Sequence, residues 1–264
     1  MILAIDAGNS RVKWGWHDGQ RWASISTVSL IEFAAANHDI NPFAATHEDP
    51  DRIVISNVAG EGAHQLIVNW TSIFEAEPLW LRGEIARCGV RSRYDEPGQL
   101  GPDRWAALIA ARALHAGDCV VVNAGTATTV DLLSAAGEFL GGLILPGVDL
   151  MRFVLHEHTG KLPIQEGEFR TTPTCTVDAI ETGCRHAQAG AVERMVRRAA
   201  PQALCLVSGG AGRALIEQLE MPTRYVENLV LEGLARVAAS EPSRRGPEAA
   251  TTTPGGSQAP VAGG

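Results

Sequence analysis

The stretch AIDAGNSRVKWG, residues 4–15, decides the fold of this 264-residue chain. It begins as an apolar strand, becomes polar at Asp6, and passes through a loop of small residues around Gly8 before strand-like residues resume. Lys13, one of two lysines in the chain, lies in the resumed strand. A glycine after a strand lets a ligand approach the backbone, and successive N–H groups in such a loop form a concavity for anions. The stretch therefore indicates a phosphate-binding turn between two strands.

The same pattern recurs in VVVNAGTATTVDLL, residues 120–133. Asn123 takes the place of Asp6, and Gly125 takes the place of Gly8. In both copies a second strand follows the loop, then a turn, then a third strand that begins at Trp22 or at Phe139. This repetition predicts two domains built on one plan, each opening with an antiparallel meander.

The rest of each half alternates strands with helices, which predicts an α/β architecture. Helical spacing and end signals appear at 61–74, 102–117, 176–200 and 227–239. We expect domains at 1–116 and 117–239. Residues 240–264 are rich in Pro, Gly, Ser, Thr and Ala and almost lack large apolar residues, so a disordered tail is expected there.

Composition limits the classes of function. The formal net charge of −8 argues against a nucleic-acid partner or an anionic membrane surface. No apolar run reaches the length of a membrane span, and no secretory leader is recognisable. The five cysteines form no C-x-x-C pair, which favours a reduced cytoplasm.

The two loops suit a polyphosphate held between them. Ser10, Thr126 and Thr128 would add hydroxyl donors, Lys13 a point charge for a phosphate oxygen, and Asp6 a ligand for Mg²⁺. A third glycine loop, residues 209–212, would pack against a base or ribose. The chain has neither G-x-x-x-x-G-K-[ST] nor G-x-G-x-x-G after its first strand, which excludes a P-loop protein and disfavours a dinucleotide oxidoreductase.

Several of these residues also have a purely structural interpretation. Asp6 could cap a turn, Lys13 could be a solvated strand residue, and Asp103 suits the dipole at the start of a helix. We reject a metal site at His156 and His158, because they fit no H-E-x-x-H pattern and we expect them in a loop.

Four groups of motifs, in order along the chain, resemble the type III pantothenate kinases, members of the acetate kinase, sugar kinase, heat-shock chaperone and actin superfamily. DAGNSRVK (6–13) and NAGTATTVD (123–131) resemble the two phosphate motifs, and GPDR (101–104) resembles the pantothenate motif Gly-x-Asp-Arg. GGLILPG (141–147), TGKLP (159–163) and TVDAIETG (176–183) resemble the later blocks. Each motif alone is weakly specific, whereas all of them in order are strongly specific.

The resemblance implies two duplicated actin-like (ribonuclease H-like) domains with a nucleotide cleft between them. It implies transfer of the γ-phosphoryl group of ATP to the primary hydroxyl of pantothenate, the first step of coenzyme A biosynthesis, with Mg²⁺ near Asp6. Asp103 would be the catalytic base, and Arg104 would pair with the substrate carboxylate through its planar fork. The implied ATP-binding residues are Asp6, Ala7, Gly8, Asn9, Ser10, Arg11, Val12, Lys13 and Thr126.

The implied pantothenate-binding residues are Tyr94, Gly101, Pro102, Asp103, Arg104 and Thr176. The family pattern also implies a homodimer with the substrate pocket at the subunit interface. It places an Asp that helps hold potassium or ammonium where this chain has Asn123, so we expect the monovalent cation to bind more weakly here.

Two other classes of function share this fold. One is a nucleotide-driven switch or scaffold, which would have no use for GPDR. The other is a catalytically weak or inactive regulatory or accessory protein, for which an acidic chain without a DNA-binding motif gives little support.

Overall fold

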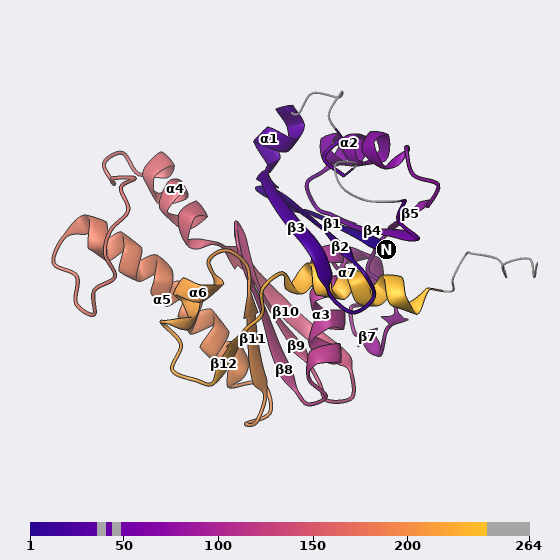
Figure 1. Cartoon of the computed structure of the whole chain (residues 1–264). Helices are drawn as coiled ribbons and strands as arrows, with labels where there is room; N and C mark the ends of the chain where they lie inside the picture. The colour runs from indigo at the N-terminus through magenta and orange to yellow at the C-terminus, as the bar shows by residue number, and fades with distance from the viewer. Residues whose placement is uncertain (36–40, 44–48, 242–264) are drawn as a thin grey trace, which may run out of the picture.

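The structure, a computed structural model, describes residues 1–35, 41–43 and 49–241. Figure 1 shows two lobes, each built around one β-sheet. The first sheet has the strand order β3-β2-β1-β4-β5 and the second β12-β11-β8-β9-β10-β7-β6. The strands are β1 (Ile2–Ala7), β2 (Arg11–His17), β3 (Trp22–Ser29), β4 (Arg52–Asn57), β5 (Pro78–Trp80), β6 (Ala86–Arg87), β7 (Val90–Ser92), β8 (Cys119–Ala124), β9 (Ala127–Leu133), β10 (Glu138–Pro146), β11 (Leu204–Ser208) and β12 (Thr223–Tyr225).

The internal repeat predicted from the sequence is confirmed by strand pairing. In the first sheet β1 pairs antiparallel with β2, β2 pairs antiparallel with β3, and β1 pairs parallel with β4. In the second sheet β8, β9, β10 and β11 are paired in the same way. The order β3-β2-β1-β4-β5 therefore reappears as β10-β9-β8-β11-β12, and the mixed α/β fold is as expected.

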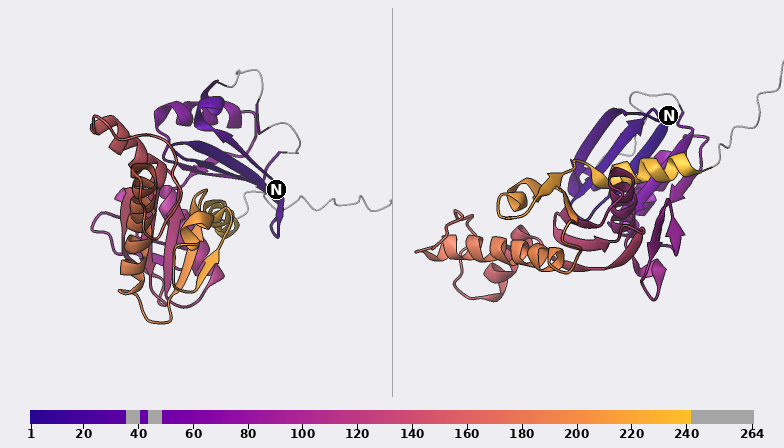
Figure 2. Two further views of the ribbon diagram at one scale, coloured as in Figure 1. Left: turned by 90° about the vertical axis from the view of Figure 1, so that its left-hand side faces the viewer. Right: turned by 90° about the horizontal axis from the view of Figure 1, so that it is seen from below.

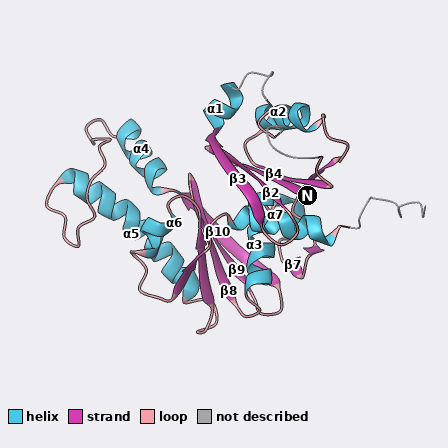
Figure 3. Cartoon of the chain, viewed as in Figure 1, coloured by secondary structure: helices cyan, strands magenta, loops and turns pink. Residues whose placement is uncertain are grey.

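The helices cover the faces of both sheets (Figure 3). They are α1 (Leu30–Ala35), α2 (Glu61–Thr71), α3 (Pro102–Leu114), α4 (Val148–His158), α5 (Thr176–Val196), α6 (Gly212–Ile216) and α7 (Leu229–Ser240), with one 3₁₀ turn at η1 (Pro97–Gln99). The helices expected at 61–74, 102–117, 176–200 and 227–239 match α2, α3, α5 and α7.

Alternation along each inner strand divides its side chains between two cores. In β1, Leu3 and Ile5 face the core under α1 and α2, whereas Ile2 and Ala4 face the core formed with α3 and α7. In β8 the residues Val120 and Val122 face α5 and α6, while the intervening residues face α3 and α7. The helices α3 and α7 thus lie between the two sheets, as the views in Figure 2 also show.

A close approach of two backbones holds α3 against α7. A Cβ atom added at Gly233 in α7 would lie 1.9 Å from the carbonyl oxygen of Ala106 in α3, so the contact requires glycine. The same helix packs on β1 and β4 of the first sheet. Through α7 the C-terminal part of the chain returns to the first lobe.

The chain enters the second sheet before residue 116, where the sequence predicted the boundary between the domains. Strands β6 and β7 precede that boundary, yet β7 pairs with β10 and β6 pairs with β7 at the edge of the second sheet. The domain limits 1–116 and 117–239 stay a prediction. The expected tail begins at Ser240, where α7 ends, and its residues 242–264 lie outside the described part of the chain.

Candidate active site

The two glycine loops have similar hydrogen bonds and meet each other. The N–H of Gly8 donates to the carbonyl of Arg11 at 2.9 Å, and the N–H of Gly125 donates to the carbonyl of Ala127 at 3.1 Å. Across the space between the lobes, Ser10 Oγ lies 2.6 Å from Thr126 Oγ1. Residues separated by 116 positions in the chain are therefore brought together, as the two-loop hypothesis requires.

Asp6 stands in a row of three polar residues on neighbouring strands. In the sheet register it lies opposite Lys13 on β2 and opposite Ser56 on β4. Paired residues of adjacent strands project on the same face of a sheet, so the three side chains form one polar strip. Within the described residues, the buried Oδ1 of Asp6 has no hydrogen-bond partner. An unpartnered carboxylate oxygen beside a phosphate-type loop fits the oxygen ligand that Mg²⁺ prefers.

Burial and a neighbouring acid disfavour the charged form of Asp6. Burial is the larger cause and the charge of Asp103 the second, and together they raise the pKa of Asp6 from 3.8 to about 7. The Ser56 hydroxyl and the Lys13 ammonium partly oppose this rise. A cation bound at Asp6 would relieve the same penalty, because it favours the carboxylate.

Asn123 occupies the corresponding position in the second sheet. It lies in register with Thr129 on β9 and with Ser208 on β11, so the pair Asp6–Ser56 reappears as Asn123–Ser208. The strip around Asn123 carries amide and hydroxyl oxygens but no charge.

The third glycine loop presses against the second. A Cβ atom at Gly209, whose φ is +96°, would lie 2.2 Å from the carbonyl oxygen of Ala124. That same oxygen accepts the N–H of Ala211 at 3.1 Å. Lys13 Nζ donates to Oδ1 of Asn228 at 3.3 Å, and Asn228 is the left-handed residue that precedes α7. Strand β2 of the first lobe thus touches the segment that leads out of the second sheet.

The GPDR segment forms the start of α3. Gly101 caps the helix and Pro102 occupies its first turn, where the missing proline N–H costs nothing. Asp103 follows at the half-buried N-terminus, and burial raises its pKa. The N–H and guanidinium of Arg104 partly oppose that rise. The charge of Asp103 in turn raises the pKa of both Asp6 and Asp131, so the three carboxyls are electrostatically coupled.

Arg104 is placed differently from the sequence-based expectation. Its side chain is 5% exposed, and its Nε and Nη2 contact the carboxylate of Asp131 at 3.2 and 2.5 Å. The planar fork expected to bind a substrate carboxylate is therefore occupied from within the protein. The remaining nitrogen, Nη1, donates to the hydroxyl of Tyr94 at 3.1 Å, which brings two expected substrate residues together.

Thr176 lies apart from these residues. It begins α5 and lines an apolar groove of about 570 Å³ with residues of α4 and α5 such as Met151, Val154 and Ile180. In Figure 1 the N-terminal end of α5 and strand β7 lie on opposite sides of the second lobe. A single chain therefore does not bring Thr176 to Tyr94.

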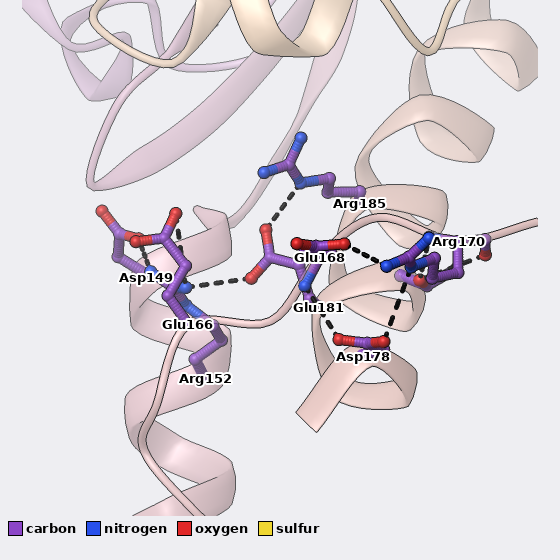
Figure 4. Close-up of polar contacts among 9 residues, drawn as sticks. Asp149, Arg152, Glu166, Glu168, Arg170, Asp178, Glu181 and Arg185 are labelled. Carbon is purple, nitrogen blue, oxygen red and sulfur yellow. Dashed lines mark hydrogen bonds and ion pairs between the residues drawn. The ribbon is translucent and has the colours of Figure 1, made fainter. Parts of the chain in front are cut away.

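A charged cavity of about 160 Å³ lies behind the second and third glycine loops, where Ala124 and Ala211 line it. Glu181 is 1% exposed. Its carboxylate accepts hydrogen bonds from Arg152 Nη1 at 2.9 Å and from Arg185 Nε at 2.6 Å. Figure 4 shows that Arg152 also faces Glu166, whereas Glu168 pairs with Arg170 in a separate group. The ion pairs tie α4 to α5.

The described residues contain no group of three or more His, Cys, Asp or Glu side chains suited to hold a metal ion. His156 and His158 lie in α4, so placing them in a loop was wrong. The apolar positions of 148–155 continue a helical pattern up to these histidines. Across the same described ranges, no helix is long and apolar enough to cross a membrane.

Sequence reasoning missed three site residues. Asp131 carried a signal, because it is a charge within the apolar strand TVDLL. Ser56 and Asn228 carried none, since only strand register and the entry to α7 bring them to Asp6 and Lys13.

Comparison with known proteins agrees with this geometry. The model of the type III pantothenate kinase family matches residues 2–198. A protein of Aromatoleum aromaticum named type III pantothenate kinase is 51% identical over 240 residues, covering 90% of this chain and 98% of the relative. One of the same name from Nitrosospira multiformis is 45% identical over 247 residues, covering 90% and 91%.

Solved structures share the fold. A Campylobacter jejuni protein described as a Baf family transcriptional activator has a TM-score of 0.61 at 22% identity, covering 90% of this chain and 97% of that one. A Sinorhizobium meliloti protein described as a 2-dehydro-3-deoxygalactonokinase has a TM-score of 0.60 at 13% identity, with the same coverage. At these identities the likeness concerns the fold alone.

The fold and the paired loops define an actin-like, ATP-dependent kinase. The chain belongs to the type III pantothenate kinase family.

Proposed function

We propose that this chain transfers the γ-phosphoryl group of ATP to the primary hydroxyl of pantothenate with Asp103 as the catalytic base. The observation that carries the proposal is the position of Asp103. It stands at the N-terminus of α3, half-buried, and close enough to Asp6 to raise the pKa of that carboxyl. A base is thereby placed beside the strip that receives the nucleotide phosphates.

The nucleotide phosphates lie between the two loops. Residues 6–13 hold them from the first lobe, with the N–H groups of Asn9 and Ser10 at the turn between β1 and β2, and the hydroxyl of Thr126 reaches them from the second. Ser10 and Thr126 already contact each other, so both hydroxyls can reach one phosphate group. Lys13, at the end of the polar strip, supplies a positive charge.

Asp6 would hold Mg²⁺, directly or through water. The bound ion would neutralise charge on the transferred phosphoryl group. Asp6 is suited to this because its Oδ1 has no hydrogen-bond partner among the described residues, and because it lies between Lys13 and Ser56 in the sheet register.

The transfer itself is a displacement at phosphorus. The substrate O–H gives its proton to the carboxylate of Asp103 while its oxygen forms a bond to the γ-phosphorus. The bond from that phosphorus to the β–γ bridging oxygen breaks, and its electron pair leaves with ADP. Burial raises the pKa of Asp103, which makes the carboxylate a stronger base.

Gly101, Pro102, Tyr94 and Arg104 bind the far part of the substrate, and Thr176 reaches it from a second copy of the chain. A homodimer is needed because the start of α5 and strand β7 lie on opposite sides of one lobe. Exposed apolar side chains on α4 and β10, Phe153, Val154 and Ile144 among them, support a subunit contact on this side.

Mixing two inactive variants tests the shared site. A dimer of one Asp103→Asn chain and one Thr176→Ala chain contains one site with an intact base and an intact threonine. Activity should therefore rise well above that of either variant after the chains are mixed and exchanged. If Thr176 served its own chain, mixing would restore nothing.

We place the enzyme in the cytoplasm and assign potassium or ammonium to the position of Asn123. All five cysteines are free thiols, which suits a reducing compartment. The assay that tests the reaction follows ADP formation with and without pantothenate. Pantothenate-dependent ADP release is expected, and ATP turnover indifferent to pantothenate would contradict the proposal.

A further inference from the structure

Arg104 is held by three different elements of the second lobe. Its guanidinium contacts Asp131 on β9 through Nε and Nη2, and Tyr94 in the segment after β7 through Nη1. The planar group also lies 5.8 Å from the Tyr94 ring centroid and 5.7 Å from that of Phe139. Arginine in such a setting has one orientation, because the fork fixes its plane and the rings fix its depth.

The backbone of β10 at Gly142 also packs against this ion pair. A Cβ atom at Gly142 would lie 2.0 Å from Oδ1 of Asp131 and 2.9 Å from Nη2 of Arg104. The backbone at Gly142 therefore lies directly against the ion pair, with no room for a side chain. This contact explains why the motif GGLILPG has glycine at position 142, since any side chain there would displace the carboxylate of Asp131.

This arrangement decides which donors are left for a ligand. The Tyr94 oxygen accepts the Nη1 proton, so its own O–H proton is free to point elsewhere. Nη1 and Nη2 each keep a second hydrogen, whereas Nε gives its only hydrogen to Asp131. A substrate oxygen therefore meets the Tyr94 hydroxyl and the tip of Arg104, not the bidentate fork.

We propose that Asp131 is a positioning residue of this kinase, which holds Arg104 so that the Tyr94 hydroxyl donates to an acceptor oxygen of the substrate. The inference rests on the proposed function, because it concerns the same substrate. Arg104 directly follows Asp103 in the first turn of α3, so the same anchor also fixes the turn that carries the base.

The test is a double-mutant cycle on the Michaelis constant for pantothenate. Asp131→Asn removes the charge that anchors Arg104, and Tyr94→Phe removes the hydroxyl. Each should raise the KM for pantothenate roughly 10-fold, the usual effect of losing a hydrogen bond that involves a charged group, while the KM for ATP changes less than about twofold. Because both changes break one chain of contacts, the double variant should be about as impaired as either single variant.

Two results would overturn the inference. One is a folded Asp131→Asn protein with an unchanged KM for pantothenate. The other is a double variant whose KM rises by the product of the single effects, roughly 100-fold, because independent contacts multiply.

Asp131→Asn leaves a buried arginine unpaired and can unfold the protein. Arg104→Lys is the second variant, since a lysine still neutralises Asp131 but lacks the third nitrogen that contacts Tyr94. It should raise the KM for pantothenate at least as much as Tyr94→Phe does, because the tip of Arg104 also meets the substrate, and Tyr94→Phe should add nothing to the effect of Arg104→Lys. Multiplied effects of these two changes would also refute the positioning role.

Glu181→Gln is the matched control, because Glu181 is another buried carboxylate held by arginines. It should lower the melting temperature without changing the KM for pantothenate. The assay of the wild-type protein separates failure of the proposed function from failure of the role of Asp131. A wild-type protein that does not phosphorylate pantothenate refutes the proposed function, whereas an active one whose variants multiply refutes only the role of Asp131.

Discussion

The hydroxyl of Ser10 lies 2.6 Å from the hydroxyl of Thr126, so the first and second glycine loops touch between the two lobes. Each residue is exposed and directly precedes the second strand of its copy of the repeated meander. A phosphate group that entered between the loops would replace this contact with two hydrogen bonds to its own oxygens.

Removal of either hydroxyl should weaken nucleotide use. Ser10→Ala or Thr126→Ala deletes one donor to a charged phosphate, so we expect the KM for ATP to rise roughly 10-fold while the KM for pantothenate changes little. Steady-state kinetics with each substrate varied in turn measure both. Ser72→Ala, at the exposed end of α2, is the control and should behave as wild type. Unchanged KM values for ATP in both loop variants would rule out this role.

Binding of the magnesium nucleotide should release protons from Asp6. Its pKa in the free protein is about 7, and a bound cation favours the carboxylate. At pH 7 about half a proton per site should therefore be released, and almost none at pH 9. Calorimetric titrations in two buffers of different ionisation enthalpy give this number. Equal proton release by Asp6→Asn would show that the proton comes from another group.

The same shift makes stability depend on pH. Between pH 4 and 7 the native protein keeps the proton on Asp6, whereas the unfolded chain, with a pKa near 3.8, has released it. The native state then binds more protons, so stability falls as pH rises through this window. Asp6→Asn lacks this loss and should melt at a higher temperature than wild type at pH 8, with the difference shrinking toward pH 4. A constant difference across this range would contradict the shift.

With Asn123, the enzyme should need a higher concentration of potassium or ammonium for activation than it would with a carboxylate at this position. Its strip offers amide and hydroxyl oxygens without a charge, so potassium or ammonium is attracted less strongly than by a carboxylate. Asn123→Asp should lower the concentration of potassium chloride that gives half-maximal activation. Initial rates are compared with a bulky-cation salt at constant ionic strength. If both proteins run equally fast without potassium or ammonium, no such site exists at position 123.

The chain should tolerate loss of its last 23 residues. The core around α7 ends at Ala238, and Glu241 contacts Arg87 at 2.5 Å. A chain ending at Glu241 should keep its melting temperature and activity. A chain ending at Ser240 loses that partly exposed ion pair, which contributes less than about 1 kcal/mol, so its melting temperature should fall by a few degrees at most. A large loss in the longer chain would contradict this prediction.

Much of the fold could be predicted because it depends on local sequence patterns that occur in both halves of the chain. Glycine loops after apolar strands marked β1, β2, β8 and β9, and helical spacing marked α3, α5 and α7. Strands β6 and β7 could not be assigned to the second sheet in this way. They are short, and only the pairing of β7 with β10, and of β6 with β7, places them in that sheet.

The site was predictable in its residues but not in its contacts. Asp103 and Tyr94 were singled out by motif, and the structure links them through Arg104. The partner of Arg104 was not predicted, because a fork that suits a substrate carboxylate suits an internal one equally well. Only the burial of the Asp131 side chain, which is 2% exposed on β9, shows that the internal carboxylate is the partner of Arg104.

The role of Asp103 is the central claim, and the rate of pantothenate phosphorylation by Asp103→Asn tests it most directly. The amide keeps the shape of the side chain but cannot accept the hydroxyl proton, so kcat should fall by roughly 10²–10⁴, while nucleotide affinity and melting temperature stay near those of wild type. A variant that binds nucleotide normally and phosphorylates pantothenate at close to the wild-type rate would show that Asp103 is not the base.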